Sequence, residues 1–464
     1  MIKIKFVGAA KTVTGSCYYV ETDKRKFIVD CGMFQGKDAK LNKSDFPFNP
    51  ADIDFVLITH AHIDHTGRLP LLVKQGFRGS IYCTSATADL LKIMLVDSGH
   101  IQEMEAIYEN KKRQRKGQPP IEPLYTAQDG DRVKEYITPV SYNHEIEIDD
   151  DIKINFKDAG HLLGSSILEI NIKDAGQNKK IVFSGDLGNT NIPIIKDYEY
   201  IENADYLVIE STYGNRFHPS LGDALDLYNI IFETTSKGGN VIIPSFAVGR
   251  TQEILYILNH YIDIEKIKRM SEVDVYLDSP LAEEATEVFE RHKECYDEEA
   301  LKSLSLDIDI LDFKKLHYVK TKEESMELNS KNGVVIISSS GMCEAGRIKH
   351  HLKYNLWKKN STILFVGFQA EGTLGRRILD GAKKVKIFGE EILVNAKIVN
   401  MPGLSGHADL KGLVNWYKNI KNGVGNRVFI THGEYESSLN LKKVFESISP
   451  ARCYIPDLME EVIL

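Results

Sequence analysis

The segment Ile58-Thr59-His60-Ala61-His62-Ile63-Asp64-His65-Thr66-Gly67 places four potential metal ligands within six residues. The apolar run that precedes it is typical of a buried strand, which here ends in a tight loop. His60 and His62 are two residues apart, so in an extended segment they project to the same side. Asp64 and His65 follow just past the turn, where they are placed to face a second ion. Imidazole and carboxylate ligands together suit zinc, so this loop predicts a metal site.

Length, charge and cysteine usage restrict the class of protein. A chain of 464 residues is too long for one ordinary core, so two domains are expected. Its 58 Lys and Arg against 66 Asp and Glu give a net charge of −8, so a nucleic-acid binder of this kind must concentrate positive charge locally. Six cysteines without a CxxC pair indicate reduced thiols. No signal-peptide pattern or membrane-length apolar run is present, and a cytoplasmic protein is expected.

Three more strand ends carry ligand-type side chains. His161 lies in a glycine-bracketed loop after the strand 152–156, and Asp186 follows the next strand in Ile181-Val-Phe-Ser-Gly-Asp186. Together with the first loop they predict a binuclear site in which Asp186 offers one oxygen to each ion. Asp30 ends the strand 27–29, where it either caps a turn or accepts a hydrogen bond from a ligating histidine.

These residues resemble a known family. Asp30, the His60-x-His62-x-Asp64-His65 loop, His161 and Asp186 are similar to the ligand set of the metallo-β-lactamase fold in type, order and spacing. The resemblance implies an α/β fold of the αββα type, with two sheets packed face to face and helices outside. It does not select a substrate, because lactamases, glyoxalases and nucleases share these ligands.

A second pattern begins after Glu210, which ends a buried strand. Strand, Gly/Ser/Pro loop and helix repeat four times, with helices expected over 251–262, 282–292, 344–357 and 376–379. Such a series predicts a doubly wound parallel sheet with helices on both faces, inserted into the first domain. The expected boundaries are 1–210 and 396–464 for the first domain and 211–395 for the insertion.

The loops of the insertion resemble anion sites. Free N–H groups at a helix start, preceded by Ser and Gly, can bind phosphate, although each loop could equally be a structural cap. Several such loops would form a track for a phosphate backbone. The candidate residues are Arg250, Gln252, Ser339, Ser340, Gly341, Gly346, Arg347, Gly372, Thr373, Gly375 and Arg376.

With Glu210, two late motifs complete a second resemblance. Ser405-Gly406-His407-Ala408-Asp409 and Thr431-His432-Gly433, together with Glu210, are similar to the additional motifs of the β-CASP nucleases, a metallo-β-lactamase subfamily with an inserted domain. The likeness covers essentially the whole chain and is strongest to compact archaeal and bacterial relatives of the polyadenylation cleavage endonuclease. Family members that act on DNA usually have an apolar residue at the position of His432, so the histidine favours RNA.

The resemblance implies a role for each residue. His60, His62 and His161 would hold one Zn²⁺, Asp64, His65 and His432 a second, with Asp186 bridging and Asp30 hydrogen-bonded behind. Mn²⁺ would fit the same ligands. A hydroxide shared by two ions would attack the phosphodiester. His407, oriented by Glu210, would protonate the leaving oxygen, leaving a 5′-phosphate and a 3′-hydroxyl. The expected enzyme is a zinc-dependent ribonuclease.

Several alternatives stay open at this stage. A small-molecule or ester hydrolase of the same fold, or a catalytically silent RNA-binding scaffold, could carry part of the pattern. Endonuclease and 5′→3′ exonuclease modes are not distinguished. The basic run Lys111–Lys116 is either a solvated helix end or an RNA contact. The apolar end Val462–Leu464 is expected to pack against its own domain or at the interface of a homodimer.

Overall fold

The computed structural model describes all residues except 175, 219–223, 264–271, 307–308 and 402–405. The chain folds into two compact units. The first unit consists of Met1–Thr190, Asp197–Phe217 and His407–Leu464, and the second of Asn191–Lys196 and His218–Gly406. The chain therefore contributes a short segment to the second unit at Asn191–Lys196, leaves the first unit again after Phe217, and returns to it at His407.

Two sheets form the centre of the first unit. The first has the order β22 (Glu461–Ile463), β1 (Lys3–Phe6), β2 (Tyr18–Glu21), β3 (Lys26–Val29), β4 (Phe55–Leu57), β5 (Ser80–Thr84) and β6 (Ile137–Val140). The second has the order β21 (Arg452–Tyr454), β20 (Val424–Thr431), β11 (Ala204–Glu210), β10 (Gln177–Phe183), β9 (Ser166–Asp174), β8 (Ile152–Asp158) and β7 (Ile146–Glu147). In β1 and β8 buried and partly exposed residues alternate, so one face of each strand enters the core.

A shared hydrophobic core joins these two sheets. Phe6 of β1 and Tyr18 of β2 contact Phe429 and Phe183 of the opposite sheet, with ring centroids 5.3 and 5.4 Å apart. Each buried aromatic side chain contributes about 1.5–3 kcal/mol to folding. The strand ends that carry the site are therefore fixed by a rigid sandwich.

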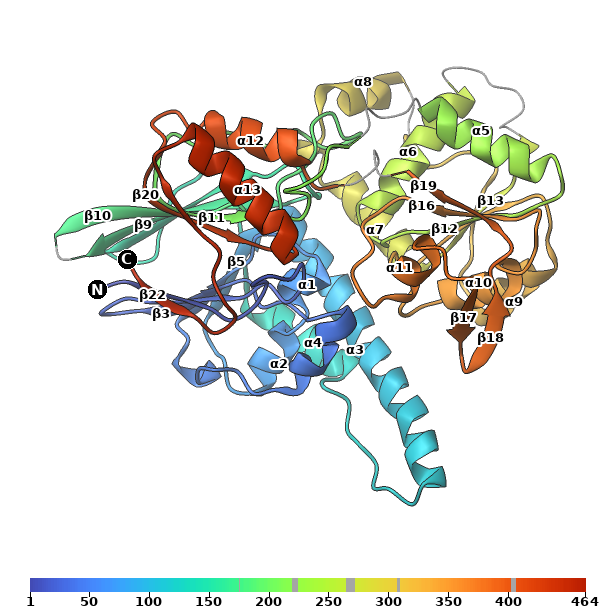
Figure 1. Cartoon of the computed structure of the whole chain (residues 1–464), viewed down its shortest axis with the longest axis horizontal. Coiled ribbons are helices and arrows are strands. Elements are labelled where there is room, and N and C mark those ends of the chain that lie inside the picture. Colours follow the sequence, from blue (N-terminus) through green and yellow to red (C-terminus); the bar gives the residue numbers. More distant parts are fainter. Residues whose placement is uncertain (175, 219–223, 264–271, 307–308, 402–405) are drawn as a thin grey trace. The chain divides into compact units, whose positions relative to one another are not determined.

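Helices cover the outer faces of this sandwich. On the side of the first sheet lie α1 (Ile63–Thr66), α2 (Leu69–Lys74), α3 (Ser85–Arg115) and α4 (Ala127–Arg132). On the other side, α12 (Leu410–Lys418) and α13 (Tyr435–Ile448) pack Trp416 and Phe445 against β20. The first unit is thus an αββα sandwich, as the sequence predicted (Figure 1).

A parallel sheet forms the centre of the second unit. Its order is β14 (Leu316–Tyr318), β13 (Val275–Asp278), β15 (Val335–Ser338), β12 (Val241–Pro244), β16 (Thr362–Phe365) and β19 (Lys397–Asn400), and all of these pairings are parallel. A hairpin of β17 (Lys384–Ile387) and β18 (Glu390–Leu393) is separate. Strands β12, β15 and β16 are buried along their whole length, which requires cover on both faces.

Helices supply that cover. The helices of this unit are α5 (Ala224–Thr235), α6 (Arg250–Asp263), α7 (Pro280–Arg291), α8 (Glu298–Leu306), α9 (Lys322–Glu327), α10 (Ile348–Asn355) and α11 (Leu374–Leu379). Figure 1 shows α5 and α6 on one side of the sheet and α10 on the other. The α/β class with a parallel inserted sheet was predicted correctly.

Two details differ from the sequence predictions, and at the C-terminus one of two expected alternatives is observed. The helix expected over 344–357 begins only at Ile348, because Gly346 has a φ of +80° and keeps the preceding residues in a loop. β19 pairs with β16 of the second unit, so the boundary expected at 395/396 falls before a strand of that unit. At the C-terminus β22 pairs with β1, and Val462 and Leu464 pack on the core of their own unit.

Within the described residues, none of the helices combines the length and apolar character that a bilayer span requires.

Candidate metal centre and catalytic site

Parallel pairing brings three of the candidate side chains to one sheet edge. β10, β11 and β20 are adjacent and parallel, so their carboxyl ends lie together. Asp186 follows β10, Glu210 is the last residue of β11, and His432 follows β20. Residues far apart in the sequence therefore meet because successive strands point the same way.

The histidine loop is held by local contacts at the end of β4. Thr66 donates from Oγ1 to the carbonyl oxygens of Ala61 and His62, at 3.1 and 2.9 Å. Asp64 and His65 lie in the short helix α1. The loop packs tightly against the N-terminal segment, where a Cβ at Gly32 would lie 1.6 Å from the carbonyl oxygen of Asp64. Only glycine permits this approach to the backbone of Asp64.

The predicted ligands form two clusters, and Asp186 belongs to the first and lies next to the second. His60, His62, His161 and Asp186 each offer a ligand atom within 4.8 Å of the others, and so do Asp64, His65 and His432. Nε2 of His60 lies 3.0 Å from Nδ1 of His62, and Nε2 of His65 lies 3.1 Å from Nε2 of His432. The structure therefore brings together all seven side chains that the sequence singled out.

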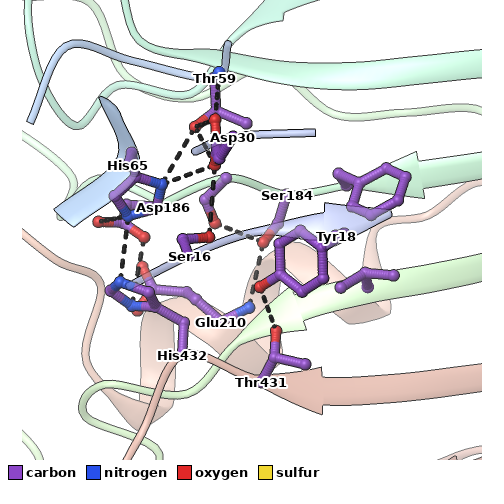
Figure 2. A pocket seen from close by; sticks show the side chains of 13 residues that line it. Ser16, Tyr18, Asp30, Thr59, His65, Ser184, Asp186, Glu210, Thr431 and His432 are labelled. Atoms are coloured by element: carbon purple, nitrogen blue, oxygen red, sulfur yellow. Dashed lines mark hydrogen bonds and ion pairs between the residues drawn. The ribbon is translucent and has the colours of Figure 1, made fainter. Parts of the chain in front are cut away.

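Asp186 lies where the two clusters meet. Its Oδ2 is 3.5 Å from Nε2 of His60 and 3.3 Å from Nε2 of His65, while its Oδ1 is 3.4 Å from Nδ1 of His432. Figure 2 shows Asp186 with His65 and His432 beside it. A carboxylate in this position can offer one oxygen to each of two neighbouring cations.

The donor set fits divalent cations. Ring nitrogens about 3 Å apart repel one another unless a proton or a metal lies between them. Tetrahedral zinc with Zn–N distances of about 2.0–2.1 Å places its ligand atoms about 3.3 Å apart, close to the separations seen. Oδ1 of Asp186 is buried without a hydrogen bond, which is costly unless a cation satisfies it. The residues present therefore match the requirements of a metal centre.

Electrostatics in the cluster also favour cations. Burial lowers the pKa of His60, and it lowers the pKa of His62 to about 4, so both rings are neutral and can ligate. Burial opposes ionisation of Asp64, but His432 and His65 outweigh it and lower the pKa of Asp64 to about 2. In the same way the surrounding histidines lower the pKa of Asp186. Burial opposes charge on His65, but Asp186 and Asp30 outweigh it and raise its pKa, so a cation bound here would displace the proton of that ring. The two ionised carboxylates, beside the neutral rings of His60 and His62, attract positive charge.

Asp30 supports the centre from behind. Its Oδ2 accepts a hydrogen bond from Nδ1 of His65 at 2.7 Å, leaving Nε2 of that ring directed at Asp186 and His432. Thr59 donates to Asp30 from its backbone N–H and from Oγ1, at 2.9 and 3.0 Å (Figure 2). Of the two interpretations of Asp30 left open by the sequence, the histidine acceptor is the one observed.

Two threonines contact this centre that sequence reasoning missed. Oγ1 of Thr59 is 3.1 Å from Nδ1 of His60, and Oγ1 of Thr212 is 3.2 Å from Nδ1 of His432. Both hydroxyls fix the orientation of a ligand ring. In the sequence, only their positions point to this role: Thr59 directly precedes His60, and Thr212 lies two residues after Glu210.

Glu210 and His407 form a separate pair beside the clusters. Nδ1 of His407 lies 3.3 Å from Oε1 of Glu210 and 3.9 Å from Oδ2 of Asp186. Glu210 is held in turn by the backbone N–H groups of Leu187 and Thr212, at 2.7 and 3.2 Å. Burial opposes charge on His407, but Glu210 and Asp186 outweigh it and raise its pKa to about 9. The geometry suits an imidazolium that can give up a proton.

The phosphate-loop candidates lie in the second unit and divide into two groups. Gln252 and Thr373 are fully buried, and their side chains bond within the unit: Gln252 to Gly249 and Ala282, Thr373 to Arg376 N and Ala370 O. Neither side chain can touch a phosphate, which corrects the expectation for these two residues. Thr373 is instead the N-cap of α11.

Arg250 and Gly341 also make contacts inside the second unit. Arg250 is 7% exposed and pairs with Glu253 three residues later, while the ring of Phe246 occupies the space beside Gly341. Ser339, Ser340, Arg347 and Arg376 keep part of their side chains exposed. Arg347 is braced by Asp278 at 2.6 Å.

Comparisons with known proteins identify the family of this chain. The metallo-β-lactamase superfamily model matches residues 10–231, the β-CASP domain model matches 251–378, and the model of the Zn-dependent metallo-hydrolase RNA specificity domain matches 391–456. Ribonuclease TTHA0252 from Thermus thermophilus is 35% identical over 439 residues, covering 94% of both chains. The transcription termination factor FttA from Methanocaldococcus jannaschii is 30% identical over 473 residues, covering 98% of this chain and 70% of its own.

A solved structure is also similar. A protein of unknown function from Enterococcus faecalis V583 covers 100% of both chains with a TM-score of 0.52 and 14% identity, a likeness of fold alone. The family resemblance expected from the sequence is confirmed. The chain belongs to the β-CASP ribonuclease family, whose members are metal-dependent hydrolases of the metallo-β-lactamase superfamily.

Proposed function

We propose that this protein is a ribonuclease that hydrolyses phosphodiester bonds of single-stranded RNA with the help of two zinc ions. The observation that carries the proposal is the meeting of both ligand clusters and the Glu210–His407 pair at Asp186. A metal centre with a proton donor beside it is what phosphodiester hydrolysis requires, because the sugar oxygen is a poor leaving group.

The ligand assignment follows the two clusters. His60, His62 and His161 would hold one zinc, Asp64, His65 and His432 the second, and Asp186 would contact both. Nitrogen-rich ligand sets favour zinc, although manganese also accepts them. When bound, such ions supply a hydroxide nucleophile near neutral pH and neutralise charge on the phosphate. Asp30 would keep His65 in the orientation that ligation needs.

His407 would act as the general acid. Its Nδ1 faces Glu210, so we assign proton donation to its other ring nitrogen, Nε2. The carboxylate of Glu210 stabilises the protonated ring and, being fixed by two backbone N–H groups, also orients it. Donation to the departing 3′ oxygen would leave a 3′-hydroxyl on one product and a 5′-phosphate on the other.

Residues 391–456, which match an RNA specificity domain, and the half-exposed loops of the second unit would select the substrate. Ser339, Ser340, Arg347 and Arg376 are the residues we assign to phosphate contacts. That relatives are named ribonuclease and transcription termination factor also supports a nucleic-acid substrate rather than an ester or a lactam.

A cleavage assay tests the proposal. Zinc-loaded protein should cut an end-labelled single-stranded RNA, and a chelator should stop it. The matched control is Asp186→Asn, which keeps the size of the side chain but removes the charge shared by both clusters. Hydrolysis of esters or lactams without RNA cleavage would favour the small-molecule hydrolase. RNA binding without cleavage by the zinc-loaded protein would favour a silent scaffold.

A further inference from the structure

The long helix α3 extends well beyond the core of its unit. It has 31 residues, and beyond Gly99 the fully described helix has Ala106 as its one buried residue. Gly99 marks the last close packing, since a Cβ there would lie 2.5 Å from Cα of Ala127. The second half of α3 projects from the sheets of its unit (Figure 1). Core packing therefore explains the first half of the helix but not the second.

Hydrogen bonds connect the projecting end of α3 to the chain that follows it. The side chain of Asn110 receives a hydrogen bond from Ile121 N at 2.8 Å and donates to Ile121 O at 2.9 Å. Nε of Arg113 donates to the carbonyl oxygen of Pro119 at 2.6 Å. These bonds fasten the returning chain to the helix. We call residues 104–121 the arm.

The arm combines positive charge with exposed apolar surface. Between Asn110 and Ile121 there are five Lys and Arg and no Asp or Glu, in a chain whose net charge is −8. Lys111, Lys112, Arg115 and Lys116 are all exposed. One turn earlier the exposed side chains are Met104, Ile107 and Tyr108, which are 64, 48 and 51% accessible.

Acidic groups near the arm do not cancel this charge. Glu105 and Glu109 lie on the same helix, Glu122 follows the arm, and Glu109 is 3.6 Å from Lys112. Nζ of Lys112 also lies 4.3 Å from the ring centroid of Tyr108. Past this point the charged side chains of the arm are all cations. Such a surface complements a polyanion, and an exposed aromatic ring next to it is a base-stacking surface.

We propose that the arm is a docking surface for the phosphate backbone of single-stranded RNA, apart from the metal centre. This proposal rests on the RNA substrate proposed above. Charge complementarity favours RNA over a protein partner, because apolar side chains alone would not require the basic tip. The RNA would contact the arm with one part of its length while another part is cut.

The length of helix between Gln102, near the histidine loop, and the cations at the tip of the arm indicates the length of RNA required. Nε2 of Gln102 lies 4.0 Å from Sδ of Met33, whose N–H bonds to Ile63 O next to Asp64. From Gln102 to Arg115 the helix rises about 20 Å at about 1.5 Å per residue. At about 3.4 Å per stacked nucleotide this corresponds to about six nucleotides. RNA shorter than this should not benefit from the arm.

The test compares two variants with the same loss of charge. The arm variant is K111Q, K112Q, R115Q and K116Q, in which glutamine preserves helix propensity. The control variant removes four exposed lysines elsewhere on the first unit, and these are Lys24, Lys134, Lys421 and Lys443. Arg113 is left in place because it fastens the returning chain.

The arm variant should have an at least tenfold higher KM for an RNA of about 30 nucleotides, with kcat unchanged. Its KM for an RNA of about four nucleotides and its hydrolysis of bis(p-nitrophenyl) phosphate should match the control. The slope of log affinity against log salt should become shallower by about 0.7 for each phosphate that the variant no longer neutralises.

The proposal is overturned if the two variants have the same KM and salt dependence for the long RNA. It is also overturned if the arm variant changes the sedimentation of the RNA-free protein, because the arm would then contact a second copy. A wild-type protein that cuts no RNA would instead refute the proposed function.

Discussion

The His407–Glu210 pair allows a prediction whose outcome depends on the leaving group. In His407→Asn, the asparagine amide can still donate to Oε1 of Glu210 in place of Nδ1, which lies 3.3 Å from that oxygen. The variant has no counterpart of the proton on Nε2. General-acid help is worth about 10²–10⁴ in rate, or about 2.7–5.4 kcal/mol of barrier. RNA cleavage should fall by this factor.

A substrate with a good leaving group separates acid catalysis from other effects. Nitrophenolate leaves without a proton, so hydrolysis of bis(p-nitrophenyl) phosphate should fall by less than about tenfold in the same variant. Single-turnover rates measure both reactions, and elemental analysis measures the metal content, which should stay at the wild-type value. Equal losses on both substrates, or loss of metal, would refute the assignment of His407. Loss of metal would mean that His407 is a ligand together with Asp186 and Glu210.

The other predictions concern charge, metal and stability. Glu210→Gln removes a carboxylate that raises the pKa of His407. The general acid must be protonated, so activity is lost as pH rises through this pKa. In the variant the alkaline limb of the plot of kcat against pH should therefore move to lower pH. An unchanged limb would count against the pair. Asp186→Ala should reduce bound metal by at least one ion per chain, and full retention in elemental analysis would contradict the bridging position. Removing metal with a chelator should lower the thermal midpoint, since a ligand at about 1,000 times its Kd stabilises the folded state by about 4 kcal/mol; an unchanged midpoint would mean that the clusters hold no structural cation. In the second unit, Asp278→Asn should lower the free energy of unfolding by about 3–5 kcal/mol, because Asp278 is fully buried and pairs with Arg347 and His351, each at 2.6 Å. Burial favours the neutral form of Asp278, but its hydrogen bonds outweigh burial and lower its pKa in the folded protein. The ionised carboxylate therefore stabilises the fold at pH values above its pKa in the unfolded chain, and this stabilisation is lost as pH falls through its pKa in the folded protein. Urea unfolding should therefore be less acid-sensitive in the variant, and equal acid sensitivity would refute this account.

Much of the metal centre could be predicted from local sequence. His60 to His65 are close in sequence, and His161, Asp186 and His432 each follow an apolar strand, so adjacent strands bring them together. A single aspartate or histidine after a strand is a weak signal, because such residues also form turns. The strong signal is that several of them follow strands in a chain that also has the His-x-His-x-Asp-His loop.

The support around the ligands could not be predicted in the same way. Thr59 and Thr212 orient ligand rings, yet threonine is common next to strand ends and its partners depend on the folded arrangement. Asp30 and His432 have φ values of 57° and 46°, which are uncommon outside glycine and which the sequence does not indicate.

The phosphate loops show where sequence patterns are ambiguous. A helix cap and an anion site both use Ser, Thr or Gly before exposed N–H groups. Burial distinguishes them: Thr373 caps α11 with no exposed surface, whereas Ser339 and Ser340 remain accessible. Burial of a loop depends on neighbours distant in sequence, such as Phe246 against Gly341.

The proposed chemistry is tested most directly by the fate of the water that attacks RNA. Zinc-loaded protein should cleave a single-stranded RNA in water enriched in heavy oxygen, and mass spectrometry should find one labelled oxygen in the 5′-phosphate of the downstream product and a 3′-hydroxyl upstream. A 2′,3′-cyclic phosphate or an unlabelled 5′ end would contradict hydrolysis at this centre.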